Sequence, residues 1–146
     1  MLPLSDTESN RYSFFPFMTF LLIAVNIGIH LIVTFTPQQN FWKFLMYYGF
    51  TPTLIAGAVG PGVISNFTSI FLQCGWTHLL GNMLPLWVFG RRVEDACGSW
   101  RFLAFYLLAG TSANLLFAVV QHDSPIPGIG ASGAIFGVMG AYLLLY

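Results

Sequence analysis

Charged residues occur in only a few short clusters of this 146-residue sequence. They make up 7% of the chain, whereas soluble domains contain about a quarter. The uncharged stretches between the clusters suit a bilayer, which a helix crosses with about 20 apolar residues. Three stretches have about that length and a fourth is shorter: Phe14–Phe35, Ser69–Gly90, Phe102–Gln121 and Gly130–Tyr146. The sequence therefore predicts an all-α fold, a polytopic transmembrane helical bundle with about four helices.

The arginines predict which side of the membrane each connection faces. Arg11 precedes the first span, and the Arg91–Arg101 stretch between the second and third spans is rich in arginine. Positive residues mark the cytoplasmic side of a membrane protein. Within a single membrane domain, we therefore expect residues 1–13 to form a cytoplasmic tail, and residues 37–66 and 122–129 to lie outside.

The 37–66 connection is uncharged apart from Lys43, and it mixes aromatic residues with glycines and prolines. Such a segment is typical of the headgroup region, so we expect an outer interfacial connection. A helix that crosses the membrane there is the alternative, because the uncharged run is long although it is interrupted.

Several kinds of partner are not expected. The formal net charge is zero and no basic stripe occurs, so the electrostatic attraction that nucleic-acid binding depends on is missing. Cys74 and Cys97 are too far apart for a metal motif, and we expect them to be small packing residues. Neither a metal nor a cofactor is predicted.

Three polar residues are expected to meet below the outer surface. His78 and Asn82 are four residues apart and so share one face of the predicted second helix. A rise of about 1.5 Å per residue places His78 about 13 Å below the outer start of that helix. Ser132 opens the fourth helix from the same side, between Gly130 and Gly133, which allow other backbones to approach closely. The three polar groups would line a water-accessible recess.

Each of these features has a structural alternative. A histidine and an asparagine on a membrane helix can simply form hydrogen bonds to a neighbouring helix. Gly133 and Gly137 form a GxxxG pattern, which is typical of close helix packing. Asn26 and His30 also share a face, on the first helix, but have no matching partner nearby, so structural hydrogen bonds are expected for them.

Two blocks of the sequence, Thr68–Gly110 and Gly128–Leu145, resemble the rhomboid intramembrane serine proteases. They combine, in order, the histidine and asparagine four apart, a Gly-x-x-x-Glu turn from Gly90 to Glu94, and Gly-x-Ser-Gly. This combination is specific, although each part alone is not. The resemblance implies a core of six or seven helices and an endopeptidase that cleaves transmembrane proteins within the lipid bilayer, near its outer face. A bacterial-type plasma membrane is the expected location.

The resemblance also implies roles for individual residues. Ser132 would be the nucleophile, which needs a base to take its proton. The side chains of His78 and Asn82 and the backbone N–H of Ser132 would donate hydrogen bonds to the oxyanion. Gly90 and Glu94 would be structural.

The resemblance also gives the motif glycines a role, and the sequence departs from the family pattern at three positions. Gly130 and Gly133 would leave room for a substrate backbone. Gln73 stands where family members often have a histidine, and Cys74 where glycine is usual. Pro85 replaces a common aromatic residue, and a proline there frees a carbonyl and can bend the helix.

The general base is missing from the pattern. In rhomboids it is a histidine about two helices after the serine, whereas His30, His78 and His122 all precede Ser132. We therefore expect the chain to be the amino-terminal part of a rhomboid core and to be inactive alone. The alternative is an inactive rhomboid-like protein that binds transmembrane segments. The sequence predicts no oligomeric state, and a channel is disfavoured because the spans hold no charged residue.

Overall fold

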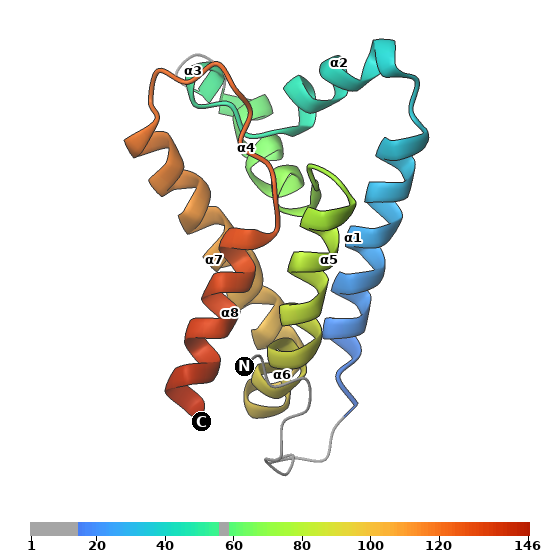
Figure 1. The fold of residues 1–146 in the computed structure, drawn as a ribbon. Helices are drawn as coiled ribbons and strands as arrows, with labels where there is room; N and C mark the ends of the chain where they lie inside the picture. Colours follow the sequence, from blue (N-terminus) through green and yellow to red (C-terminus); the bar gives the residue numbers. More distant parts are fainter. Residues whose placement is uncertain (1–14, 56–58) are drawn as a thin grey trace.

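The computed structural model describes residues 15–55 and 59–146, so the predicted tail of residues 1–13 lies outside the described residues. Within these ranges the chain is helical and has no strand, only one isolated bridge between Phe50 and Gly128. The all-α prediction is confirmed. The elements run in the order α1 (Phe17–Phe35), α2 (Gln38–Tyr48), α3 (Pro52–Ile55), α4 (Val59–Thr68), η1 (Ser69–Phe71), α5 (Trp76–Pro85), η2 (Leu86–Gly90), α6 (Arg91–Cys97), α7 (Ser99–Val120) and α8 (Ser132–Leu145) (Figure 1).

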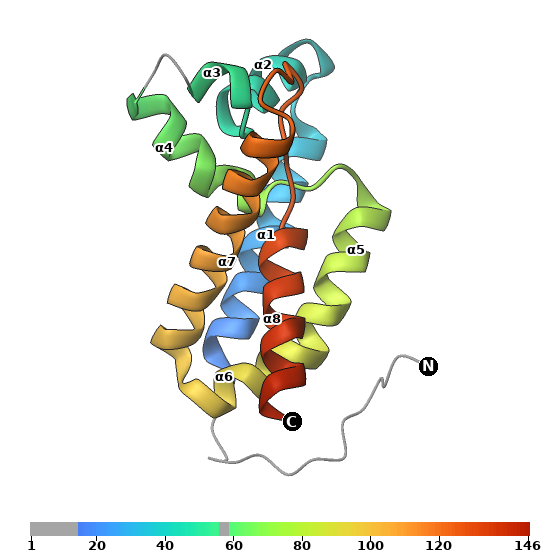
Figure 2. The same ribbon diagram turned by 90° about the vertical axis from the view of Figure 1, so that its left-hand side faces the viewer.

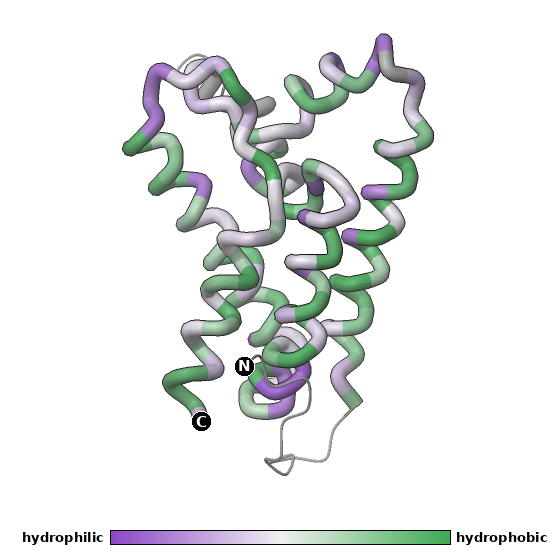
Figure 3. The backbone as a smooth tube through the Cα atoms, viewed as in Figure 1, coloured by the Kyte–Doolittle hydropathy of each residue, from purple (hydrophilic) through white to green (hydrophobic). Residues whose placement is uncertain are grey.

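Two of these helices are long and apolar enough to cross a membrane. They are α1, with 19 residues, and α7, with 22 residues. The apolar helix α8 has 14 residues. Hydrophobic residues dominate the middle of the bundle, and hydrophilic residues gather towards its two ends (Figure 3). The distribution is that of a helical membrane bundle.

The second predicted span is helical but not uniformly so. Pro85 ends α5, and the five residues of η2 are π-helical before α6 continues the chain. Proline has no N–H and its ring clashes with the carbonyl four residues earlier, so the regular hydrogen-bond pattern cannot continue through it. A π-helical turn is one way in which a helix accommodates such a break. The α-helix thus ends at Pro85, while the freed carbonyl and the bend predicted there remain predictions.

The predicted start of this span at Ser69 is wrong. Ser69 begins a short 3₁₀ turn, and the backbone is then extended at Leu72 (ψ 146°) and Gly75 (φ 166°, ψ 179°). The α-helix begins only at Trp76. His78 therefore lies in the first turn of α5, rather than deep within a helix that starts at Ser69.

Three short helices, α2, α3 and α4, form the connection between α1 and η1, at the end of the bundle opposite to α6 (Figures 1 and 2). They have 11, 4 and 10 residues. At about 1.5 Å per residue none reaches across a hydrocarbon core of about 30 Å. The described part of the connection thus contains no crossing helix, and its place at the outer interface remains a prediction.

Helix α8 packs closely against α7. A Cβ atom on Gly137 would lie 2.6 Å from the Cβ of Ala109, and one on Gly133 would lie closer still to the Cβ of Ala113. Both glycines of the GxxxG pattern therefore face alanines of α7, and the predicted close packing is confirmed.

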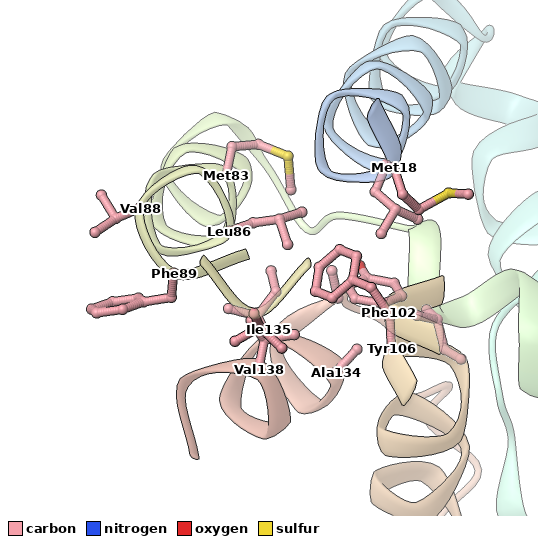
Figure 4. Close-up of a cluster of buried hydrophobic side chains, with 14 of the residues drawn as sticks. Met18, Met83, Leu86, Val88, Phe89, Phe102, Tyr106, Ala134, Ile135 and Val138 are labelled. Carbon is pink, nitrogen blue, oxygen red and sulfur yellow. The ribbon is translucent and has the colours of Figure 1, made fainter. Parts of the chain in front are cut away.

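The core lies where α8 and α7 meet η2, α5 and α1. Figure 4 shows Met83 of α5 and Leu86 of η2 on one side, and Ile135 and Val138 of α8 beside them. Leu86 and Val138 have no exposed surface. Cys97 packs against this core as predicted, whereas Cys74 is exposed, so the packing prediction is wrong for Cys74.

A fully buried carboxylate joins three elements at the opposite end from α2. The two oxygens of Glu94 in α6 accept hydrogen bonds from the backbone N–H groups of Met18 and Thr19, both at 2.8 Å, and from the Thr19 hydroxyl at 2.7 Å. The Ser99 hydroxyl of α7 donates another. The N–H groups of Met18 and Thr19 have no partner within α1, and the positive end of the helix dipole favours a negative charge there. Glu94 thereby fixes the start of α1 against α6 and α7.

We predict that Glu94→Gln lowers the free energy of unfolding by about 2–4 kcal/mol, because an NH₂ group then faces donors and the charge at the helix terminus is lost. Unfolding of the detergent-solubilised protein by sodium dodecyl sulfate, followed by circular dichroism, measures this change. Asp123→Asn is the control, since that side chain is 89% exposed and its substitution should change stability by no more than about 0.5 kcal/mol. Equal effects of the two substitutions would contradict the account.

Candidate active site

Ser132 is the first residue of α8, and no side chain of the described residues caps this helix. The first backbone hydrogen bond at this end runs from the Ile135 N–H to the Ala131 carbonyl, at 3.0 Å. The N–H groups of residues 132–134 come before it and have no partner within the helix. Together with the helix dipole, these N–H groups favour negative charge beside the Ser132 hydroxyl.

The segment before Ser132 is held by backbone hydrogen bonds. The Gly130 N–H donates to the Ser69 carbonyl at 2.9 Å, and Phe50 and Gly128 exchange two bonds of 3.0 and 2.8 Å. Asn114 of α7 in turn donates to the Ser69 hydroxyl at 3.0 Å. The position of Ser132 is therefore fixed by η1, α7 and the residues after α2.

His78 and Ser132 converge at Gly130. A Cβ atom built on Gly130 would lie 3.4 Å from the Ser132 Oγ, 3.4 Å from the His78 Nε2 and 2.8 Å from the His78 Cε1. Gly130 also has a φ of +134°, in a region that favours glycine. The imidazole edge and the serine hydroxyl thus both border the space that a side chain at Gly130 would occupy.

This packing changes the interpretation of the motif glycines. The sequence suggests that Gly130 and Gly133 leave room for a substrate. In the structure the imidazole of His78 takes the space at Gly130, and Ala113 takes the space at Gly133. The glycines therefore allow the protein's own groups to approach each other.

A hydrogen bond determines which nitrogen of His78 carries the proton. The backbone N–H of Cys74 donates to the His78 Nδ1 at 3.2 Å. A neutral imidazole has one acceptor and one donor nitrogen, so Nε2 carries the proton. The nitrogen that borders the same space as the Ser132 Oγ is thus a donor, which suits the stabilisation of an oxyanion and not the removal of a proton.

Asn82 lies one turn beyond His78 on the same face of α5 and is 5% exposed. Its Nδ2 donates to Gln73 at 2.8 Å, and Gln73 donates to Asn26 of α1 at 2.9 Å. The sequence predicts a structural hydrogen bond for Asn26 but does not connect it with this site. The signal was the polar i, i+4 pair on the first helix, whose partner cannot be identified from spacing alone.

The other two histidines lie elsewhere. His30 is buried, but its ring packs edge-on against Trp76 with centroids 4.7 Å apart, and neither ring nitrogen has a hydrogen-bond partner in the described part of the chain. The structural hydrogen bond predicted for His30 is therefore wrong. His122 is 74% exposed and pairs with Asp123 at 2.9 Å, after the end of α7. Among the described residues no group of three or more potential ligands for a metal ion occurs.

Comparison with known proteins shows the family of this chain. The family model described as "Rhomboid domain" matches residues 61–146, which include both His78 and Ser132. The chain belongs to the rhomboid family. It is 37% identical to the rhomboid protease GluP of Bacillus subtilis over 129 residues, which are 88% of this chain and 24% of GluP.

Two eukaryotic members of the rhomboid family are also similar. The identity is 29% to the chloroplastic rhomboid-like protein 11 of Arabidopsis thaliana, over 86% of this chain and 41% of that protein. It is 28% to the mitochondrial rhomboid protein 1 of Saccharomyces cerevisiae, over 88% of this chain and 36% of that protein. The chain thus spans less than half the length of each of these relatives. Membership of this family and the apolar helices make it a membrane protein.

Gly130→Ala tests the close approach of His78 and Ser132 in this rhomboid chain. We predict a loss of about 1–3 kcal/mol in the free energy of unfolding, because the new methyl group meets the imidazole and the backbone conformation disfavours it. Gly140→Ala in α8 is the matched control, since a Cβ atom there would meet nothing within 4 Å. This control should be neutral or stabilising by up to about 1 kcal/mol. Similar denaturation curves for both variants would refute the close approach.

Proposed function

We propose that this chain forms part of an intramembrane serine endopeptidase, with Ser132 as its nucleophile. The observation that supports this best is the convergence of the Ser132 hydroxyl and the His78 imidazole at Gly130, beside the uncapped start of α8. The similarity to a protein named a rhomboid protease adds support. The substrates would be transmembrane proteins in the lipid bilayer, cut near the outer face.

The site residues would act in sequence on a peptide carbonyl. The Ser132 Oγ attacks the carbonyl carbon while its proton leaves to a base, and the carbonyl oxygen becomes an oxyanion. Donors that already point at this oxygen stabilise the transition state without rearranging. In this proposal they are the His78 Nε2–H, the Asn82 amide and the Ser132 backbone N–H. Collapse of the intermediate breaks the C–N bond as the base returns its proton to the leaving nitrogen, and water then hydrolyses the acyl-enzyme.

The base would come from residues outside 1–146. The His78 Nε2 is a donor, His30 packs on Trp76, and His122 pairs with Asp123. We therefore expect no proteolysis from residues 1–146 alone, because general-base assistance contributes roughly 10²–10⁴ in rate.

Within residues 1–146 none of the three histidines is placed as a base, which leaves a second candidate, an inactive rhomboid-like protein that binds transmembrane segments. Such a protein would have no need for an uncapped helix start beside a serine and an imidazole, so we rank it second. We also propose that the amino terminus and α6 face the cytoplasm and that the site opens to the outer side, because the arginines cluster near α6. Since relatives include chloroplastic and mitochondrial proteins, a bacterial-type plasma membrane is a proposal.

Ser132→Ala tests the nucleophile. In a form of the protein that extends beyond Tyr146, this substitution should abolish cleavage of a fluorogenic transmembrane substrate and labelling by a fluorophosphonate probe. Ser112→Ala on α7 is the control and should leave both unchanged. Cleavage that persists in Ser132→Ala would exclude Ser132 as nucleophile, and an unsubstituted protein that neither cleaves nor reacts would favour the inactive candidate.

The proposed donor roles of His78 and Asn82 predict a partial loss of activity when either side chain is removed. His78→Ala and Asn82→Ala should each lower kcat by about 10²–10³ with little change in KM, as expected for loss of one oxyanion donor. Steady-state kinetics on the extended form measure this. Full activity in both variants would show that these side chains serve only to hold the helices together.

A further inference from the structure

A chain of three buried side-chain amides runs from α1 to the candidate active site. The Asn26 Nδ2 donates to the Leu22 carbonyl at 2.8 Å, the Gln73 Nε2 donates to the Asn26 Oδ1 at 2.9 Å, and the Asn82 Nδ2 donates to the Gln73 Oε1 at 2.8 Å. The exposed fractions of Asn26, Gln73 and Asn82 are 0%, 5% and 5%. Water therefore does not compete for these bonds.

The first member fixes the direction of the whole chain. A backbone carbonyl can only accept, so Asn26 has to turn its NH₂ group towards Leu22 and its oxygen towards Gln73. Gln73 then has to offer its NH₂ group to Asn26 and its oxygen to Asn82. Flipping any one amide would place two acceptors or two donors against each other, which is costly in a buried setting. Asn82 is thereby required to turn its NH₂ group towards Gln73.

The extended segment before α5 contacts both proposed oxyanion donors. The Gln73 side chain bonds Asn82, and the backbone N–H of the next residue, Cys74, bonds the Nδ1 of His78. Both contacts leave N–H groups rather than lone pairs available: Nε2–H on His78 and the second Nδ2–H on Asn82. A freely rotating Asn82 amide would also present its oxygen, which repels an oxyanion.

We propose that Gln73 and Asn26 are positioning residues, which act on catalysis by holding the Asn82 amide with its NH₂ group available to the oxyanion. Asn26 lies 47 residues before Gln73 in the sequence, so a residue of α1 sets the orientation of a side chain in α5. The catalytic part of this inference rests on the proposed function. The hydrogen-bond chain itself does not.

The chain of hydrogen bonds can be tested on residues 1–146, because the measurement needs no proteolytic activity. With ¹⁵N-labelled asparagine side chains in detergent, the Asn82 NH₂ signals are assigned by their loss in Asn82→Ala. Gln73→Met, which keeps the side-chain volume, and Asn26→Leu should both shift these signals. Thr34→Val is the matched control on α1, because within the described part of the chain the Thr34 hydroxyl bonds the His30 carbonyl and no other group. Signals that move no more in Gln73→Met than in Thr34→Val would overturn the proposal.

The catalytic consequence is tested by a double-mutant cycle in the active, extended form. Gln73→Met should lower kcat roughly 10–100-fold at nearly constant KM, the range expected when a catalytic group is misplaced. In the Asn82→Ala background the same substitution should change kcat less than about 2-fold, because a residue that acts through Asn82 has nothing left to position.

The outcomes separate this proposal from the proposed function. A loss of activity from Gln73→Met that is undiminished in the Asn82→Ala background would mean a general structural role and would overturn the proposal. If the unsubstituted protein has no activity, the proposed function fails, and the NMR comparison alone decides whether the amide chain orients Asn82. If Asn26→Leu does not fold, Gln73→Met alone serves for the NMR comparison and for the double-mutant cycle.

Discussion

A polar group buried in this apolar bundle is costly when it has no hydrogen-bond partner, because water is absent there. That cost explains the main long-range contacts. The Glu94 carboxylate satisfies the N–H groups at the start of α1. Asn114 satisfies the carbonyl of Asn66 and the hydroxyl of Ser69. These contacts fix helix ends that apolar packing alone would leave free to slide.

Close contacts between helices also determine where the candidate site lies. Glycine-to-alanine packing against α7 sets where α8 lies, and so where its first residue, Ser132, is placed. The hydrogen bond from Gly130 to the Ser69 carbonyl fixes the approach of the chain to that point. His78 then fills the space that a side chain at Gly130 would need. Serine, imidazole and free backbone N–H groups are thus brought together by close backbone approach rather than by a flexible loop.

Much of this arrangement is predictable from the sequence, because hydropathy and residue spacing are local properties. The long apolar helices α1 and α7 and the packing role of Gly133 are examples. The start of α5 at Trp76 is not predictable in this way. It depends on an extended segment whose Gln73 side chain bonds Asn26, 47 residues away. The filling of the space at Gly130 by His78 likewise depends on how two distant helices meet.

The central claim is that His78 faces Ser132 as a hydrogen-bond donor. The most direct test is the ¹⁵N NMR spectrum of the imidazoles of residues 1–146 at neutral pH, with the His78 signals assigned by their loss in His78→Gln. The account predicts a protonated Nε2 and an unprotonated Nδ1 that accepts the Cys74 N–H. The opposite tautomer, with its proton on Nδ1 and a free lone pair on Nε2, would make His78 a base towards Ser132 and would contradict the account.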